Sequence, residues 1–262
     1  MLRNELQARL IYFGSIMPRN VIENKFNREY ASLAKIQPGM ALEFTVKSAS
    51  DPYLDLNNSR LHVLAKITKA DGTNIDPNTA ALINLTLNSM FREIGLELNG
   101  QNVGATSQLY PYRSVLESLL KFCKEVQETH LLSEGWTKDT SGQINVTAVG
   151  GNNAGLNARA ATFARSTLVK LIGRHHLDVF HQERLIPPNI DHHMKLIPSP
   201  NDFVCKSATP GQGALENYKL VIQSANIIIR TTKLTSTAHK ALMDLLVSQN
   251  MVHHLSRVQM KH

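Results

Sequence analysis

Short segments in which apolar and polar residues alternate recur along the 262-residue chain, and they constrain its fold more than any other feature. Between Ala41 and Lys47, Leu42, Phe44 and Val46 alternate with polar residues, which is the pattern of a half-buried β-strand. Further strands are predicted at residues 60–68, 81–88, 92–99, 166–172, 177–180, 192–197 and 218–231. Together these segments predict an all-β protein, an antiparallel eight-stranded jelly-roll barrel or sandwich.

The first of two short helices is predicted to follow the strand at residues 92–99. Asn99-Gly100 closes that strand with the residue pair that type I′ turns prefer. Pro111 suits the first turn of a helix, where its missing N–H costs nothing. Apolar residues at helical spacing then predict one continuous face, packed on a sheet edge: Tyr112, Val115, Leu116, Leu119, Leu120 and Cys123.

The last strand, Tyr218–Thr231, changes phase along its length. Leu220 and Ile222 lie on one face of a regular strand, whereas the apolar residues after them fall on the other, which predicts a bulge near Ser224–Asn226. The second short helix is expected to begin at Ser236, with an apolar face made by Ala238, Ala241, Leu242 and Leu245.

Three regions follow from these patterns. Residues 1–40 are interpreted as an N-terminal arm that crosses the domain or a neighbour, residues 41–235 as the jelly-roll domain, and residues 236–262 as a C-terminal helix and tail. Within the domain, residues 133–162 are rich in Gly, Asn, Thr, Ser and Ala. They predict a long surface loop that grips a neighbouring subunit, since structureless loops of this length are usually functional.

Charge, cysteine content and hydropathy indicate which partners and cellular compartment the protein is expected to have. The net charge of +7 is dispersed along the chain, which is typical of a solvated surface and leaves only a non-specific contact with nucleic acid as an alternative. Two cysteines, Cys123 and Cys205, are predicted to be free thiols in a reducing compartment. The sequence has no run of 18 apolar residues, so no membrane span is expected, and its N-terminus is a poor secretory signal.

Motifs for catalysis and metal binding are incomplete. His181-x-Glu183 with Cys205 matches half of a zinc deaminase signature, but the Pro-Cys-x-x-Cys half is missing. Adjacent histidines in a strand point to opposite faces, so a histidine doublet does not readily supply two ligands to one ion; the doublets are His175-His176, His192-His193 and His253-His254. Gly211-Gln212-Gly213 lacks the Lys-Ser/Thr of a phosphate loop. We therefore predict no enzyme activity, no catalytic residue, no metal and no cofactor.

Several segments in order resemble the first jelly roll of the double jelly-roll major capsid proteins of Polinton (Maverick) elements and adintoviruses. The resemblance spans roughly residues 28 to 260. It is carried by residues 53–57, 66–73, 84–91, 98–100, 110–120, 136–140, 171–174, 178–180 and 202–203. These segments are structural and mark a fold lineage rather than an active site.

The resemblance implies a hexon-like subunit of an icosahedral shell, which forms a homotrimeric, pseudo-hexagonal capsomer and also contacts other capsid proteins. It places the protein in the virion, after assembly in the host nucleus or cytoplasm. The implied structural or assembly residues are Asn99, Gly100, Tyr110, Pro111, Tyr112, Arg113 and Trp136. The family's chains continue into a second jelly roll, whereas this sequence stops at His262; a truncated endogenous copy, a fragment and a single-barrel relative are the interpretations.

Three other functions stay open at this point. One is a minor, penton-like capsid protein. Another is a non-enzymatic jelly-roll binding module, such as a carbohydrate-binding domain, which would need an exposed aromatic platform; Trp136 and Tyr110 are too isolated in the sequence to suggest one. The third is a shell component that contacts packaged DNA, for which affinity should fall steeply with salt.

Overall fold

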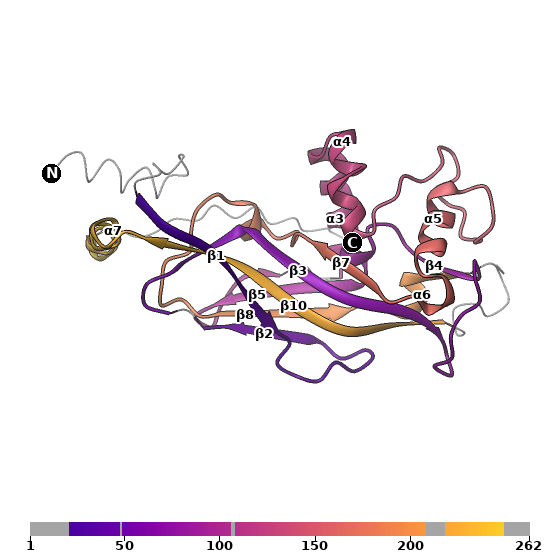
Figure 1. Ribbon diagram of the computed structural model, residues 1–262, viewed down its shortest axis with the longest axis horizontal. Helices are drawn as coiled ribbons and strands as arrows, with labels where there is room; N and C mark the ends of the chain where they lie inside the picture. The colour runs from indigo at the N-terminus through magenta and orange to yellow at the C-terminus, as the bar shows by residue number, and fades with distance from the viewer. Residues whose placement is uncertain (1–20, 48, 106–107, 208–217, 249–262) are drawn as a thin grey trace.

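Two four-stranded antiparallel sheets face each other in the protein (Figure 1). The computed structural model describes residues 21–47, 49–105, 108–207 and 218–248. One sheet has the order β1 (Ile22–Ala31), β10 (Tyr218–Leu234), β3 (Tyr53–Lys69) and β7 (Val169–Gly173). The other has the order β2 (Leu42–Val46), β8 (His192–Pro198), β5 (Phe91–Leu98) and β6 (Gln101–Ala105). A separate two-stranded sheet joins β4 (Ala80–Leu82) to β9 (Cys205–Ser207).

The hydrophobic core lies between the two large sheets. Phe44 on β2 and Leu196 on β8 meet Ile67 on β3 and Ile227 on β10 in one cluster, and all four side chains are buried. Each sheet therefore turns one face inward, which is why its strands alternate in polarity. The predicted all-β, antiparallel, eight-stranded jelly-roll fold is confirmed.

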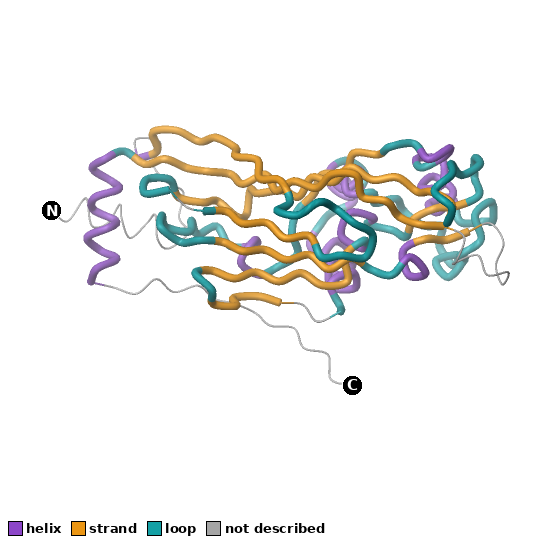
Figure 2. The backbone as a smooth tube through the Cα atoms, turned by 90° about the horizontal axis from the view of Figure 1, so that it is seen from below, coloured by secondary structure: helices purple, strands orange, loops and turns teal. Residues whose placement is uncertain are grey.

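Helical segments are more numerous than the two predicted. The α-helices are α2 (Thr86–Ser89), α3 (Tyr110–Lys121), α4 (Lys124–Gln127), α5 (Ala154–Thr162), α6 (Asn201–Val204) and α7 (Ser236–Ser248). The 3₁₀ turns are η2 (His130–Glu134), η3 (Ala164–Ser166) and η4 (Asp178–His181). Figure 2 shows α7 across one end of the sandwich, where Leu242 packs with Tyr53 and Leu234. No helix among the described residues is both long enough and apolar enough to span a membrane.

Several predicted elements are confirmed with small shifts of their ends. Strands form close to the predicted positions at β2, β5, β8 and β10, and α7 begins at Ser236. In the β5–β6 turn, Asn99 and Gly100 have φ of 48° and 75°, the two positive values that a type I′ turn requires. The register of β10 against β3 shifts between Ile222 and Ser224, at the edge of the predicted bulge.

Two parts of the first sheet differ from the prediction. Ile22–Ala31, expected within an arm, pairs along its length with β10 as an edge strand. Most of its side chains are exposed or half-buried, so the sequence has no clear apolar alternation there. The segment 53–58, which precedes the strand predicted at residues 60–68, already belongs to β3. Consecutive residues of it are buried because both faces are covered: Leu54 and Leu56 lie in the main core, and Tyr53 packs with Leu242 of α7. The Asp55 carboxylate accepts hydrogen bonds from the backbone and side-chain amides of Asn58.

Two predicted strands are wrong. Residues 81–88 hold only the short β4, and Thr86–Ser89 form α2 instead; Leu85, with φ of 50°, opens this turn. All residues of α2 are buried, so its sequence shows no alternation of buried and exposed positions by which a strand could be distinguished from a helix. The predicted strand at residues 177–180 falls mostly within η4 (Asp178–His181), in which the consecutive residues Val179 and Phe180 are both buried. Residues 1–20, Gly211–Gly213, His253-His254 and the tail 249–262 lie outside the described residues.

Candidate assembly surface

Helix α3 carries four of the seven predicted assembly residues and has two chemically different faces. It stands beside the sandwich together with α4 (Figure 1). The helix begins at Tyr110, one residue before the proline expected to lead it. Tyr110, Ser114 and Ser118 are buried, at the i, i+4, i+8 spacing of one helical face. The face that packs on the barrel is therefore polar, contrary to the apolar face that the sequence predicts.

A buried hydrogen-bond chain holds Tyr110, the first residue of this face, against the barrel. The Tyr110 hydroxyl donates to Asn88 Oδ1 at 2.8 Å and accepts from the backbone N–H of His176 at 3.2 Å. Asn88 Nδ2 donates in turn to Glu134 Oε2 at 2.9 Å. Burial raises the pKa of Tyr110 and raises the pKa of Glu134 to about 7. The barrel thus offers polar partners that a sequence pattern does not reveal.

Arg113 links the same helix to η4 by charge. Its Nε donates to Glu117 Oε1 at 3.0 Å, and its Nη2 donates to Asp178 Oδ1 at 2.5 Å. The Arg113 side chain is only 12% exposed, so these pairs are better shielded from solvent than ordinary surface ion pairs. Arg113 is therefore a residue that fixes α3 on the barrel.

The opposite face of α3 is apolar and faces solvent. Tyr112, Leu116, Leu119 and Leu120, which we call the α3 apolar face, are 54%, 57%, 49% and 83% exposed. Tyr112 contacts Phe203 of α6, with ring centroids 6.0 Å apart. Cys123, directly after the helix, is exposed as well. Grouped exposed apolar residues on one helix mark an interaction surface more often than isolated ones do.

The remaining predicted residues lie in the interior or in turns. The Asn99 side chain accepts a hydrogen bond from the Asp191 backbone at 2.8 Å, which ties the β5–β6 turn to the segment before β8. Trp136 is 7% exposed and packs with Leu85 and Leu131, against which Val115 of α3 also lies. Since Trp136 and Tyr110 are both buried, these two rings form no exposed platform for a carbohydrate.

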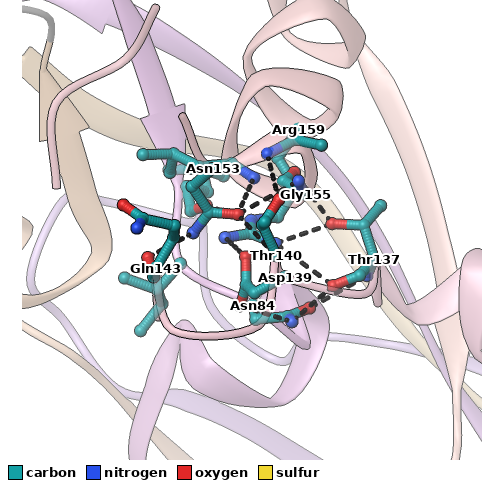
Figure 3. A network of polar contacts seen from close by, with 12 residues as sticks. Asn84, Thr137, Asp139, Thr140, Gln143, Asn153, Gly155 and Arg159 are labelled. Atoms are coloured by element: carbon teal, nitrogen blue, oxygen red, sulfur yellow. Dashed lines mark hydrogen bonds and ion pairs between the residues drawn. The ribbon is translucent and has the colours of Figure 1, made fainter. Parts of the chain in front are cut away.

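Residues 133–162 fold onto the barrel instead of forming a plain surface loop. Arg159 of α5 is 5% exposed and donates to the Leu82 carbonyl at 2.9 Å and to Asp139 Oδ1 at 3.0 Å. Asn84 Nδ2 donates to the Thr137 carbonyl at 2.6 Å (Figure 3). The side chain of Asn153 caps α5 by accepting from the backbone amides of the first helical turn. A contact of this segment with a neighbouring subunit stays a prediction.

Sequence reasoning did not single out Asn88 or Glu134, and it did not predict the contact between Glu117 and His176. Asn88 lies inside a segment that was interpreted as a strand, and His176 was considered only as half of a doublet. His175 and His176 lie after the end of β7 rather than in a strand, and His176 hydrogen-bonds to Glu117. A polar residue between apolar neighbours is the one signal that the sequence offers, and it does not name the partner.

Comparison with known proteins bears on the fold. The sequence matches no established family profile and no curated protein. A chain from the cryo-EM structure of the Sputnik virophage has a TM-score of 0.54 at 11% identity, covering 85% of this chain and 50% of that one. PBCV-1 VP54, fitted into a reconstruction of Sputnik, gives 0.52 at 7% identity, with coverages of 87% and 46%. The Faustovirus major capsid protein gives 0.50 at 7% identity, with coverages of 88% and 57%.

The chain therefore spans about half the length of these solved structures. At such low identity the likeness shows the fold alone. The jelly roll of this protein is thus similar to part of the chains found in viral particles, one of which is described as a major capsid protein.

Proposed function

We propose that the protein is a non-enzymatic structural subunit of a viral-type capsid, hexon-like and encoded by a Polinton- or adintovirus-like DNA element. The fold similarity to a major capsid protein supports the capsid role. The element type rests on the sequence resemblance alone.

The observation that carries the proposal is the α3 apolar face on this fold. Leu116 and Leu120 differ by four positions and lie one above the other on the helix, which gives a neighbour a continuous apolar ridge. The polar side of α3 is already held by Tyr110 and Arg113, so the helix presents the ridge from a fixed position. Burying apolar area gains roughly 25 cal/mol per Å², which favours association with another barrel.

In this proposal the chain self-associates through the α3 apolar face into a homotrimeric, pseudo-hexagonal capsomer and then joins other capsid proteins in the virion. Assembly takes place in the host nucleus or cytoplasm. The net charge of +7 supports a non-specific contact with packaged DNA. The assembly residues on the barrel side, Tyr110, Pro111 and Arg113, act by positioning α3.

Sedimentation velocity over a range of protein concentrations tests this assembly. The wild-type chain should form a discrete trimer, whereas Leu116→Lys/Leu120→Lys should sediment as a monomer, because two charges would be desolvated at each contact. Leu33→Lys is the matched control, since Leu33 is 62% exposed but lies in the β1–β2 connection. Circular dichroism should be the same for all three proteins.

A wild-type chain that stays monomeric at high micromolar concentration would contradict self-association through this surface. Equal loss of the trimer in Leu33→Lys would show that any added charge prevents assembly. The thiol of Cys123 gives a second readout, because Cys205 is buried and Cys123 is exposed. Maleimide labelling of Cys123 should be slower in the trimer than in the Leu116→Lys/Leu120→Lys monomer.

A further inference from the structure

Three metal-ligating side chains from separate parts of the chain meet on the inner side of α3. They are Glu117 of α3, His176 after β7 and His181 at the end of η4. His176 Nδ1 lies 2.8 Å and His181 Nε2 lies 2.9 Å from the same atom, Glu117 Oε2. The three ligand atoms lie within 4.8 Å of one another. This cluster lies apart from the α3 apolar face and is not explained by assembly.

The second oxygen of Glu117 is held by cations. Arg113 Nε lies 3.0 Å and Lys121 Nζ lies 3.7 Å from Oε1. Asp178 balances part of this charge through its contact with Arg113. The carboxylate is thereby oriented so that Oε2 faces the two imidazoles, as outer groups orient the ligands of metal sites.

The geometry of the cluster suits a small tetrahedral ion. Zinc binds imidazole nitrogen and carboxylate oxygen at about 2.0–2.2 Å, which separates neighbouring ligand atoms by about 3.4 Å. The two measured separations from Oε2 are shorter by about half an ångström. Small side-chain rotations would therefore admit the ion, without a change in the backbone.

The surroundings of the three side chains also fit metal binding. The His176 side chain is only 1% exposed, so it holds its imidazole in a fixed position beside Glu117. His181 and Glu117 are 18% and 16% exposed, which leaves one side open to solvent for the entry of an ion and a water ligand.

We propose that Glu117, His176 and His181 bind one divalent transition-metal ion, with zinc as the ion that fits the ligand set. Two imidazoles and one carboxylate select transition metals over Ca²⁺ and Mg²⁺, which prefer oxygen ligands alone. The ion joins α3 to η4 and to the segment after β7. It therefore fixes the helix independently of whether the apolar face assembles.

Equilibrium dialysis of the untagged full chain, stripped with EDTA and then titrated with zinc chloride, tests the site. The chain has eleven histidines, so stoichiometry alone does not locate an ion, and variants are needed. His181→Ala and Glu117→Gln should each weaken the tightest zinc binding by at least about 10- to 100-fold. Losses of that size follow when groups that only support metal ligands are mutated, so the loss of a ligand should cost no less. His193→Ala is the matched control, because His193 lies between two carboxylates, Glu43 and Glu97, at 3.7 and 3.8 Å.

Cobalt(II) gives a readout that does not depend on the variants. Substituted into the wild-type chain, it should show the intense visible absorption of a tetrahedral site, and zinc should abolish that absorption by competition. Zinc should also raise the Tm of the wild type and of His193→Ala but not that of His181→Ala. Absence of zinc binding at micromolar concentration, an octahedral cobalt spectrum, or unchanged affinity in both His181→Ala and Glu117→Gln would overturn the proposal. In those cases the cluster is a hydrogen-bonded ion pair only.

Discussion

At the scale of single residues, Tyr110 decides which face of α3 meets the barrel. Its hydroxyl donates to Asn88 and accepts from the backbone of His176, all out of contact with solvent. A buried polar group needs such partners, because leaving one unpaired costs about 1–3 kcal/mol. The tyrosine was singled out from the sequence for its place in a family-like segment, whereas its mechanism depends on Asn88, which no pattern indicates.

Tyr110→Phe should lower the free energy of unfolding by about 1–3 kcal/mol, because it leaves the Asn88 oxygen and the His176 amide without their shared partner. Urea denaturation followed by fluorescence measures this change. Tyr112→Phe is the control, since Tyr112 is 54% exposed and its loss of a hydroxyl should change stability by less than about 0.5 kcal/mol. Equal effects of the two substitutions on stability would argue against a stabilising role of the buried hydrogen-bond chain.

Glu134 should make stability depend on pH. Burial raises its folded-state pKa to about 7, so the folded protein binds this proton more tightly than the unfolded chain does. The resulting stabilisation is fully present below about pH 4.5 and is lost as the pH rises through 7, a change of about 3 kcal/mol. Glu134→Gln should remove this component from urea unfolding measured between pH 4.5 and 8. An identical pH profile in the variant would contradict the assignment.

At the scale of elements, the sequence predicts strands well where one face is buried and the other is exposed to solvent. β2 is the simplest case, with Leu42, Phe44 and Val46 buried in alternation. Prediction fails where both faces are buried, as in α2, and where a strand lies at an exposed edge, as in β1. It also fails for α3, whose position is predicted correctly but whose buried face is polar. Helical periodicity shows that a helix has an apolar face, but it does not show whether that face packs on the barrel or stays exposed.

In the candidate site, too, the sequence predicts local features but not contacts between distant residues. The turn at Asn99-Gly100 could be predicted because positive φ at two consecutive residues is a local requirement. The meeting of Glu117 with His176 and His181 joins residues about 60 positions apart, so only the fold reveals it. The network of Asn84, Asp139 and Arg159 has the same long-range origin.

Gly155→Ala should loosen the folded segment 137–162. A Cβ at this position would lie 2.6 Å from the Lys138 carbonyl oxygen and 2.7 Å from Asp139 Oδ1, so backbone and ion pair must both move. We expect a loss of about 1–3 kcal/mol in the free energy of unfolding and faster amide exchange in this segment. Gly95→Ala is the control, because its Cβ would meet nothing within 4 Å. Unchanged exchange in Gly155→Ala would show that the segment is not packed tightly.

At the scale of the whole molecule, the barrel holds its own core together and still presents an apolar ridge to solvent. The sandwich buries residues from both sheets in one cluster, and α7 and α5 cover opposite ends (Figure 1). The α3 apolar face therefore lies on the surface of the described sandwich, outside its core cluster. This combination of a rigid barrel and one exposed helix face suits a subunit that meets neighbours at a fixed angle.

Cryo-electron microscopy of the wild-type oligomer, isolated by size exclusion, tests the central claim most directly. The account predicts a closed trimer in which each α3 apolar face, including Leu116 and Leu120, is covered by a neighbouring barrel. An oligomer in which these leucines face solvent, or particles that are single barrels at every concentration, would contradict it.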